Sequence, residues 1–537
     1  MNSPVGGPVG GRPTRLRHAL FLMLGPALAL LVYFLLPHSE ALTHAGRATA
    51  AVAVLMTVWW LAEVIPLEVA GLMPLVLLPA LGVMDLKRVA PAYADPIILL
   101  FLGGMLLGQA LERWGLHRRI GLSAVALLGS SPSRLVAAIL AATAFMSMWV
   151  SNTAAAVMML PIATSVVSAV KAETSDADPR LTRNLGLSLV LAVAYGASIG
   201  GVGTLIGTPP TAQIAAFANS RYGAGSLTFA QWLVVGVPAV VLCCGVAWVL
   251  LTRFLYPVRG ANLASVHPVL MQRRRELGRM SSPEWRVLVI FAATAAAWIA
   301  VPMLESVEPF RAALVWVESS KDGTVIAQWA RASDTAIAIA GALLLFIVPA
   351  GVPAGSRERR GDAATRADVA PPRPLLTWAE GSQVPWGVLL LFGGGLALAK
   401  AIEVTGFDKY LAGFGGALTD WPSELVVAFT VVAATFLSEV TSNTAQTAIM
   451  LPVGAAFAQS VNAPAGVVLI PGVLGACLAF MLPGGTPPNA VVFSSRLITI
   501  RQMAWAGLWM NLACAVVVVG LVLVLRALGW LPGLGWR

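Results

Sequence analysis

Charged side chains are scarce in this chain of 537 residues, because Asp, Glu, Lys and Arg together make up 11% of it and 58% of the residues are hydrophobic. A soluble domain has roughly a quarter of its residues charged. The chain therefore has too little polar surface for a water-soluble globule, and lipid is the solvent that suits it. The formal charge of +10 does not indicate a nucleic-acid partner, because Lys and Arg lie in short loops and form no basic face. Basic loops of this kind are a topology signal of membrane proteins.

Cysteine and histidine are also scarce. The four cysteines lie inside apolar segments without a CxxC pattern and are interpreted as small hydrophobic residues; they are Cys243, Cys244, Cys477 and Cys514. An intramembrane protease is an alternative that would need a Ser–His or paired-Asp arrangement inside the spans. The five histidines lie at the ends of apolar segments or in loops, which disfavours this alternative: His18, His38, His44, His117 and His267. We therefore predict that the chain is not an enzyme.

Long apolar runs, in contrast, recur along the whole chain. A run of about 20 apolar residues spans the hydrocarbon core as a helix, and several runs here are too short to cross alone. The polar tail 1–17 precedes the first run without a clear cleavage site, so we expect a retained helix and not a removed signal. The expected segments are 19–37, 48–66, 68–84, 96–113, 133–150, 154–170, 187–206, 230–254, 286–304, 334–352, 385–403, 424–441, 445–459, 464–482 and 503–528.

Three loops carry most of the charge and predict the topology. The loops 256–285 and 355–383 are rich in arginine, whereas 305–331 is acid-leaning. The positive-inside rule places the N-terminus and the two basic loops in the cytoplasm and the third loop outside. The predicted organisation is a cytoplasmic tail, N-terminal helices, a first repeat, a cytoplasmic loop, connecting helices, a charged loop and a second repeat, at 1–17, 18–94, 95–255, 256–285, 286–354, 355–383 and 384–528.

The two halves of the chain carry the same polar motif. Ser151-Asn152-Thr153 and Ser442-Asn443-Thr444 each interrupt apolar sequence, and Asn152 and Asn443 are 443 − 152 = 291 positions apart. The same shift relates Glu112 to Glu403, Ser147 to Ser438, and Leu160-Pro161 to Leu451-Pro452. One shift that holds over some sixty residues indicates an internal repeat.

A second motif pair follows downstream. Gly207-Thr208-Pro209-Pro210 corresponds to Gly485-Thr486-Pro487-Pro488 with a shift of 485 − 207 = 278. The first half therefore has 291 − 278 = 13 extra residues, which fit in its charged loop 171–186. Two repeats with interrupted helices at matching positions indicate a secondary transporter whose site lies at the repeat interface. If the repeats are inverted, the matching motifs approach the midplane from opposite sides.

These motifs suit an anion bound together with cations. Hydroxyl and carboxamide groups donate to an anion and ligate a cation, and a helix N-terminus adds unpaired N–H groups and about half a positive charge. No charged side chain lies in any of the four motifs, so a dianion would need its charge offset by bound cations such as Na⁺ and by helix ends. Glu112 and Glu403 fall near span ends and are interpreted as structural. Glu439, three residues before Ser442, is assigned equally to structure and to support of the site.

Three segments resemble a known family. Ser147–Ala154, Thr441–Val453 and Leu482–Ala490 are similar to the divalent anion:sodium symporter family of di- and tricarboxylate transporters, and the resemblance covers about 47–528. It implies an all-α polytopic fold with two inverted repeats, re-entrant helical hairpins and broken helices. It also implies a scaffold domain, to which the helices in 18–94 and 286–354 would belong, a transport domain, a homodimer and an elevator motion.

The resemblance also implies the site residues. A first sodium site would use Ser147, Ser151, Asn152 and Gly207, and a second would use Ser438, Thr441, Asn443 and Gly485. The substrate carboxylates would contact Asn152, Thr153, Thr208, Ser442, Asn443, Thr444, Thr486 and Pro487. Ser438 stands where a Thr is more usual in the family, but the hydroxyl is kept.

The expected function is sodium-coupled symport of C4-dicarboxylates such as succinate, malate or fumarate. Two or more sodium ions would be transported, across a plasma membrane that we expect to be a bacterial inner membrane. One alternative is sodium-independent dicarboxylate exchange, which some family members perform, although no Lys or His lies in the motifs to replace the ion. Another is symport of a different divalent anion, such as citrate, tartrate or sulfate, because the same donors would meet each of them.

Overall fold

The computed structural model describes residues 15–39, 42–128, 131–173, 179–223, 225–258, 275, 277–305, 333–351, 373–413 and 421–531. Within these ranges the regular secondary structure is helical, apart from two isolated β-bridges. Most of the predicted loops 256–285, 305–331 and 355–383, and most of the tail 1–17, lie outside the described residues. The sides of the membrane on which they lie therefore remain predictions.

Most consecutive helices are joined by short connections, whereas longer segments lie between residues 255 and 282, 305 and 333, and 347 and 378. Their bounds are α1 Arg15–Leu35, α2 His44–Ala62, α3 Leu67–Ala70, α4 Met73–Ala80, α5 Leu86–Val89, η1 Ala90–Ala94, α6 Pro96–Arg113, α7 Leu116–Leu128, α8 Pro132–Ser147, α9 Asn152–Glu173, α10 Pro179–Gly201, α11 Pro209–Tyr222, α12 Phe229–Val249, η2 Leu250–Leu255, α14 Ser282–Glu305, α17 Ser333–Ile347, α18 Trp378–Gly381, α19 Trp386–Val404, α20 Phe407–Ala412, α21 Ser423–Ser438, α22 Asn443–Ser460, α23 Ala465–Ala476, α24 Pro487–Ser494 and α25 Ile500–Ala527.

Eight helical segments of the described chain are long and apolar enough to cross a membrane, and six further apolar helices are shorter. The short ones include α8 and α21, each of which ends four residues before the first residue of a Ser-Asn-Thr motif. A segment predicted as one span, 68–84, forms two short helices, α3 and α4, because the chain turns at Gly71 and Leu72.

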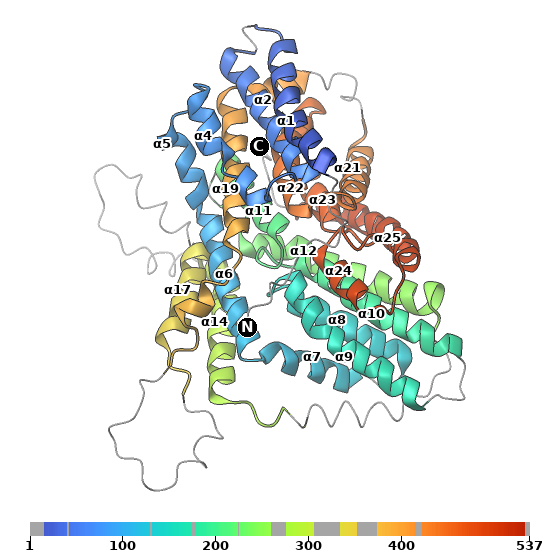
Figure 1. The fold of residues 1–537 in the computed structure, drawn as a ribbon. Coiled ribbons are helices and arrows are strands. Elements are labelled where there is room, and N and C mark those ends of the chain that lie inside the picture. Colours follow the sequence, from blue (N-terminus) through green and yellow to red (C-terminus); the bar gives the residue numbers. More distant parts are fainter. Residues whose placement is uncertain are drawn as a thin grey trace.

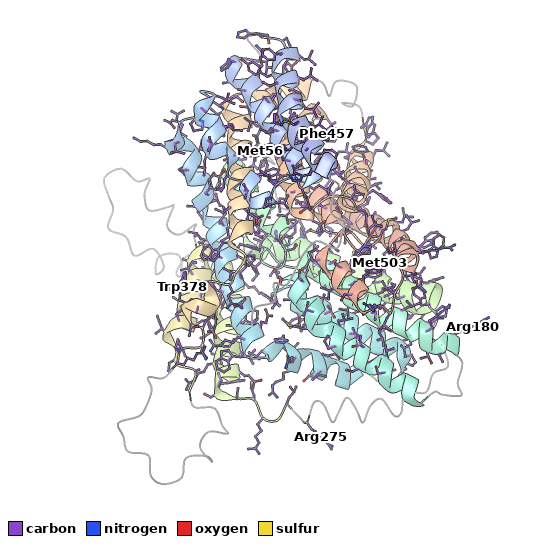
Figure 2. The ribbon with its side chains drawn as sticks, viewed as in Figure 1. Met56, Arg180, Arg275, Trp378, Phe457 and Met503 are labelled. Atoms are coloured by element: carbon purple, nitrogen blue, oxygen red, sulfur yellow. The ribbon has the colours of Figure 1, made fainter. Side chains whose placement is uncertain are left out.

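The helices form two packed regions. The smaller one joins α2, α4 and α5 to parts of α19, α20 and α22, and contains the fully buried Met56. The larger one runs from α6 to α25 and contains the fully buried Met503. Figure 1 shows α1, α2 and α4 at one end of the molecule and α7 to α10 at the other, and Figure 2 labels Met56 and Met503 in these separate regions.

The two hairpins that carry the Ser-Asn-Thr motifs come from opposite ends of this arrangement. The first hairpin, α8 and α9, lies beside α10 at the end occupied by α7, whereas the second, α21 and α22, lies toward the end occupied by α2 (Figure 1). The tips of both hairpins line the same cavity. The arrangement agrees with the predicted inverted repeats.

Candidate functional site

A cavity of about 490 Å³ lies where the hairpin tips meet. All eight predicted substrate contacts line it: Asn152, Thr153, Thr208, Ser442, Asn443, Thr444, Thr486 and Pro487. Five of the eight predicted cation ligands line it as well: Ser151, Asn152, Gly207, Asn443 and Gly485. Of the remaining three, Ser147 and Ser438 are the last residues of the hairpin helices α8 and α21, and Thr441 lies in the tip between α21 and α22. The structure thus brings all four motifs to one place.

Four helices begin at this cavity. α9 and α22 start at Asn152 and Asn443, and α11 and α24 start at Pro209 and Pro487. The first N–H groups of a helix have no intrahelical acceptor, and the N-terminus carries about half a positive charge. Four such ends around one cavity form an anion-binding environment without a lysine or arginine.

The two Gly-Thr-Pro segments have nearly the same backbone geometry. Thr208 adopts φ −145° and ψ 148°, and Thr486 adopts φ −151° and ψ 145°; both precede a helix whose first residue is proline. Proline is suited to this position because its missing N–H has no helical partner there. Neither threonine hydroxyl caps its own helix, so both hydroxyls are available to a ligand.

Asn152 ties the first hairpin to the first Gly-Thr-Pro segment. Its amide faces Ser147 Oγ at 2.8 Å and the carbonyl oxygens of Ala197 and Gly207 at 3.3 Å each, and donates to all three when its NH₂ group is turned toward them. The Ser147 hydroxyl donates to the Ala197 carbonyl at 2.6 Å. Gly207 is required here, because a Cβ at this position would lie 2.9 Å from the Ser147 carbonyl oxygen. With the Asn152 Oδ1 turned toward them in place of the NH₂ group, these oxygens are close enough together to form a sodium site.

The second hairpin tip has a matching set of oxygens. The Thr441 hydroxyl donates to the Leu437 carbonyl at 2.8 Å, and the Ser438 hydroxyl donates to the Thr435 carbonyl at 3.0 Å. Asn443 lines the cavity, and its Oδ1 is buried without a hydrogen-bond partner among the described residues. A buried amide oxygen is stable only with a partner, and a bound cation would supply one.

Glu439 is the residue whose role sequence reasoning left open. Its buried carboxylate accepts the backbone N–H groups of Phe480, Met481 and Leu482 at 2.7 to 3.1 Å. It also accepts the Asn511 amide at 2.7 Å. The loop that it holds leads directly to Gly485, at which a Cβ would lie 3.2 Å from the Glu439 carbonyl oxygen. Glu439 thereby positions the second Gly-Thr-Pro segment against the second hairpin.

Glu112 and Glu403, which are both interpreted as structural from the sequence, lie in different surroundings. Glu403 forms an ion pair with Lys400 at 2.9 Å and is not among the residues that line the cavity, which fits its structural interpretation. Glu112, in contrast, lines the cavity from α6. The opposite wall also includes residues that the motifs did not indicate: Glu63, Phe101, Met105, Gln109, Val384 and Val388.

Membrane-length helices, matched hairpins and a polar cavity at their tips define a secondary membrane transporter and not an enzyme. Residues 18–531 match the family model described as "Sodium:sulfate symporter transmembrane region". The chain belongs to this family, which is the divalent anion:sodium symporter family that the motifs resemble.

Two curated relatives cover most of the chain. The sodium-dependent dicarboxylate transporter SdcS of Staphylococcus saprophyticus is 35% identical over 500 residues, which are 93% of this chain and 89% of the relative. The SdcS protein of Staphylococcus aureus is 35% identical over 499 residues, with the same coverage of both chains.

Two solved structures share the fold at low sequence identity. The YdaH transporter of Alcanivorax borkumensis aligns with a TM-score of 0.53 at 14% identity, over 96% of this chain and 99% of the other. MtrF of Neisseria gonorrhoeae aligns with a TM-score of 0.54 at 11% identity, over 96% of each chain. The predicted all-α polytopic fold is confirmed.

Proposed function

We propose that this protein is a secondary active transporter that couples the uptake of C4-dicarboxylates, such as succinate, malate or fumarate, to sodium ions. The convergence of four helix N-termini and two Ser-Asn-Thr motifs on one cavity carries this proposal. Its two half-sites are alike, so each can receive one of two carboxylate groups. The names of the relatives in Staphylococcus, sodium-dependent dicarboxylate transporters, support the same assignment.

In this proposal each repeat binds one carboxylate and one sodium ion. Asn152, Thr153 and Thr208 would contact one carboxylate, and Ser442, Asn443, Thr444, Thr486 and Pro487 would contact the other. Ser147, Ser151, Asn152 and Gly207 would hold one ion, and Ser438, Thr441, Asn443 and Gly485 the second. Hydroxyl, amide and carbonyl oxygens suit Na⁺, and the ions offset a dianion that meets no cationic side chain.

The remaining parts of the proposal concern the whole assembly. The hairpins would move as part of a transport domain against a scaffold of N-terminal and connecting helices, which is an elevator motion. The protein would be a homodimer in the plasma membrane, a bacterial inner membrane, with its N-terminus in the cytoplasm. The basic loops on either side of the connecting helices support this orientation.

Uptake of radiolabelled succinate into proteoliposomes tests the proposal. An inward sodium gradient should stimulate accumulation severalfold over an equal choline gradient. Uptake that ignores Na⁺ but requires internal dicarboxylate would replace symport by exchange. Competition with sulfate, tartrate and citrate tests the substrate class: inhibition by sulfate alone would contradict a dicarboxylate site.

A further inference from the structure

The wall of the cavity opposite the hairpin tips is formed largely by one face of α6. Five of its residues line the cavity, at positions 101, 105, 108, 109 and 112. Residues spaced by three, four and seven positions lie on the same face of a helix, so this stripe presents its residues continuously to the cavity. Its last member, Glu112, is an exposed carboxylate.

Glu112 lies close to the first Ser-Asn-Thr motif. A Cβ at Gly108 would lie 3.1 Å from the Trp149 carbonyl oxygen, so α6 touches the first hairpin tip two residues before Ser151. Glu112 follows Gly108 by four residues, which is about 6 Å along a helix. Its carboxylate therefore faces the cavity about one helical turn from the hairpin.

The charged side chains that line this cavity are negative, whereas a site for an anion alone would favour positive ones. Among the described residues that line it, Glu63 and Glu112 carry charge and none is Lys, Arg or His. The guanidinium of the neighbouring Arg113 is engaged by Glu380 and by the Leu375 carbonyl outside the cavity lining. Two carboxylates in a cleft with low-dielectric walls attract cations and repel free anions.

The internal repeat offers a comparison that isolates Glu112. The matching residue, Glu403, is neutralised by Lys400, whereas the residue that matches Lys400 in the first repeat is Gln109 (400 − 291 = 109). No described cation lies within ion-pair distance of Glu112. The carboxylate at this position is therefore paired in α19, whereas in α6 it has no cationic partner among the described residues.

A separate observation indicates that the cavity takes a cation. The Asn443 Oδ1, on the opposite side of the cavity, is buried and has no hydrogen-bond donor among the described residues. An oxygen that accepts from no N–H or O–H group is suited to ligate a metal ion, as sodium is held by uncharged oxygens in transporters.

We propose that Glu112 concentrates sodium ions in the cavity and so lowers the sodium concentration that transport requires. The proposal rests on the sodium-coupled uptake proposed above. Glu112 acts at a distance through its charge, and the hairpin oxygens hold the ion. One unit charge about 10 Å away changes a local cation concentration by about two- to threefold, at an effective dielectric constant of about 20–30 and a Debye length of about 10 Å.

Initial rates of succinate uptake should be titrated with external Na⁺ in proteoliposomes, at a total ionic strength near 0.1 M kept constant with choline. Glu112→Gln should raise the half-saturating Na⁺ concentration about two- to threefold. Glu403→Gln, at the matched position, should leave it unchanged, and Glu112→Asp should keep the wild-type value. At about 1 M total salt on both sides, the difference should disappear, because the Debye length falls from about 10 Å to about 3 Å.

Unchanged half-saturation in Glu112→Gln would overturn the proposal, and so would an increase that persists at high salt, which is the behaviour of a structural defect. If Glu112→Gln does not fold, a wild-type sodium requirement that does not rise with added choline salt would also overturn it. Wild-type uptake without any sodium dependence would instead contradict the symport on which the proposal rests.

Discussion

At the scale of single residues, the asparagines that open α9 and α22 are the least replaceable groups of the cavity. The Asn152 amide joins Ser147 of α8, Ala197 of α10 and Gly207 of the first Gly-Thr-Pro segment. A Cβ at Gly201 would collide with the Asn152 side chain, so its environment leaves no room for adjustment. Asn443 presents an unpartnered oxygen at the matching place. Alanine at either position removes both the amide donors and the oxygen ligand.

We therefore expect Asn152→Ala and Asn443→Ala each to reduce sodium-driven succinate uptake at least about tenfold, since a lost charge-assisted hydrogen bond costs about 1.5–3 kcal/mol. Expression in the membrane should be unaffected. The control is Asn184→Ala, because Asn184 bonds the Pro257 carbonyl away from the cavity. Normal transport by either cavity variant would contradict the paired-site model.

The Glu439 carboxylate predicts a second residue-scale effect. Glu439→Gln keeps the size of the side chain but replaces one acceptor oxygen by a donor that faces backbone N–H groups. We expect a loss of stability of about 2–4 kcal/mol, from the usual cost of unpaired buried groups near a lost charge. Thermal unfolding in detergent measures it. Glu424→Gln, at the exposed start of the same helix, should unfold at the wild-type temperature. If both variants unfolded at the same temperature, the hydrogen bonds of the Glu439 carboxylate would not account for the loss of stability.

At the scale of elements, the positions of the breaks could be predicted and some of the helices could not. The polar triplets revealed the hairpin tips because they interrupt apolar sequence at a constant shift. The expected segments leave out α11 and α24, because each begins with two prolines, and proline, which interrupts a helix interior, also starts helices. The partners of Glu439 are 41 to 72 positions away in the sequence, so only tertiary structure brings them together.

The helix α11 is anchored at both ends. It starts at the cavity and ends at Tyr222, and the preceding Arg221 pairs with Asp408 of α20 at 2.5 Å, with side-chain exposures of 12% and 5%. Removing one member of a buried ion pair leaves an uncompensated charge, whereas replacing both by apolar residues is often neutral. The pair therefore fixes the position of α11 relative to α20.

Arg221→Leu should lower the stability by about 3–5 kcal/mol, and the double variant Arg221→Leu/Asp408→Leu should recover most of the loss. Thermal unfolding in detergent, with and without succinate and Na⁺, compares the two. A double variant as unstable as the single one would show that the ion pair does not account for the anchoring.

At the scale of the whole molecule, an elevator motion predicts that the cavity opens to one side of the membrane at a time. The four native cysteines are unpaired and lie within helices or directly after one, so a background with all four replaced by alanine suits labelling. In that background, Thr153→Cys should react with a membrane-impermeant maleimide, because Thr153 is exposed and lines the cavity.

Saturating Na⁺ and succinate should slow this labelling severalfold, since the site is then occupied and the population is redistributed between orientations. If neither Na⁺ nor succinate changed the labelling rate from one side of the membrane, the assignment of this cavity as the binding site would be contradicted. A cysteine at exposed Lys87 of α5, a charged position that does not line the cavity, serves as the control whose labelling should not respond to the ligands.

The near-identity of the Thr208 and Thr486 backbones has a consequence for which molecules bind best. A cavity built from two like halves presents the same contacts to a ligand and to that ligand rotated end over end. Succinate and fumarate are themselves unchanged by that rotation, so each can dock in two interchangeable poses. Malate, with one hydroxyl, keeps two equivalent poses as long as the halves are alike, and loses about 0.4 kcal/mol (RT ln 2) when they are not and only one pose binds. Only a difference between the two halves can therefore select one end-over-end orientation of bound malate.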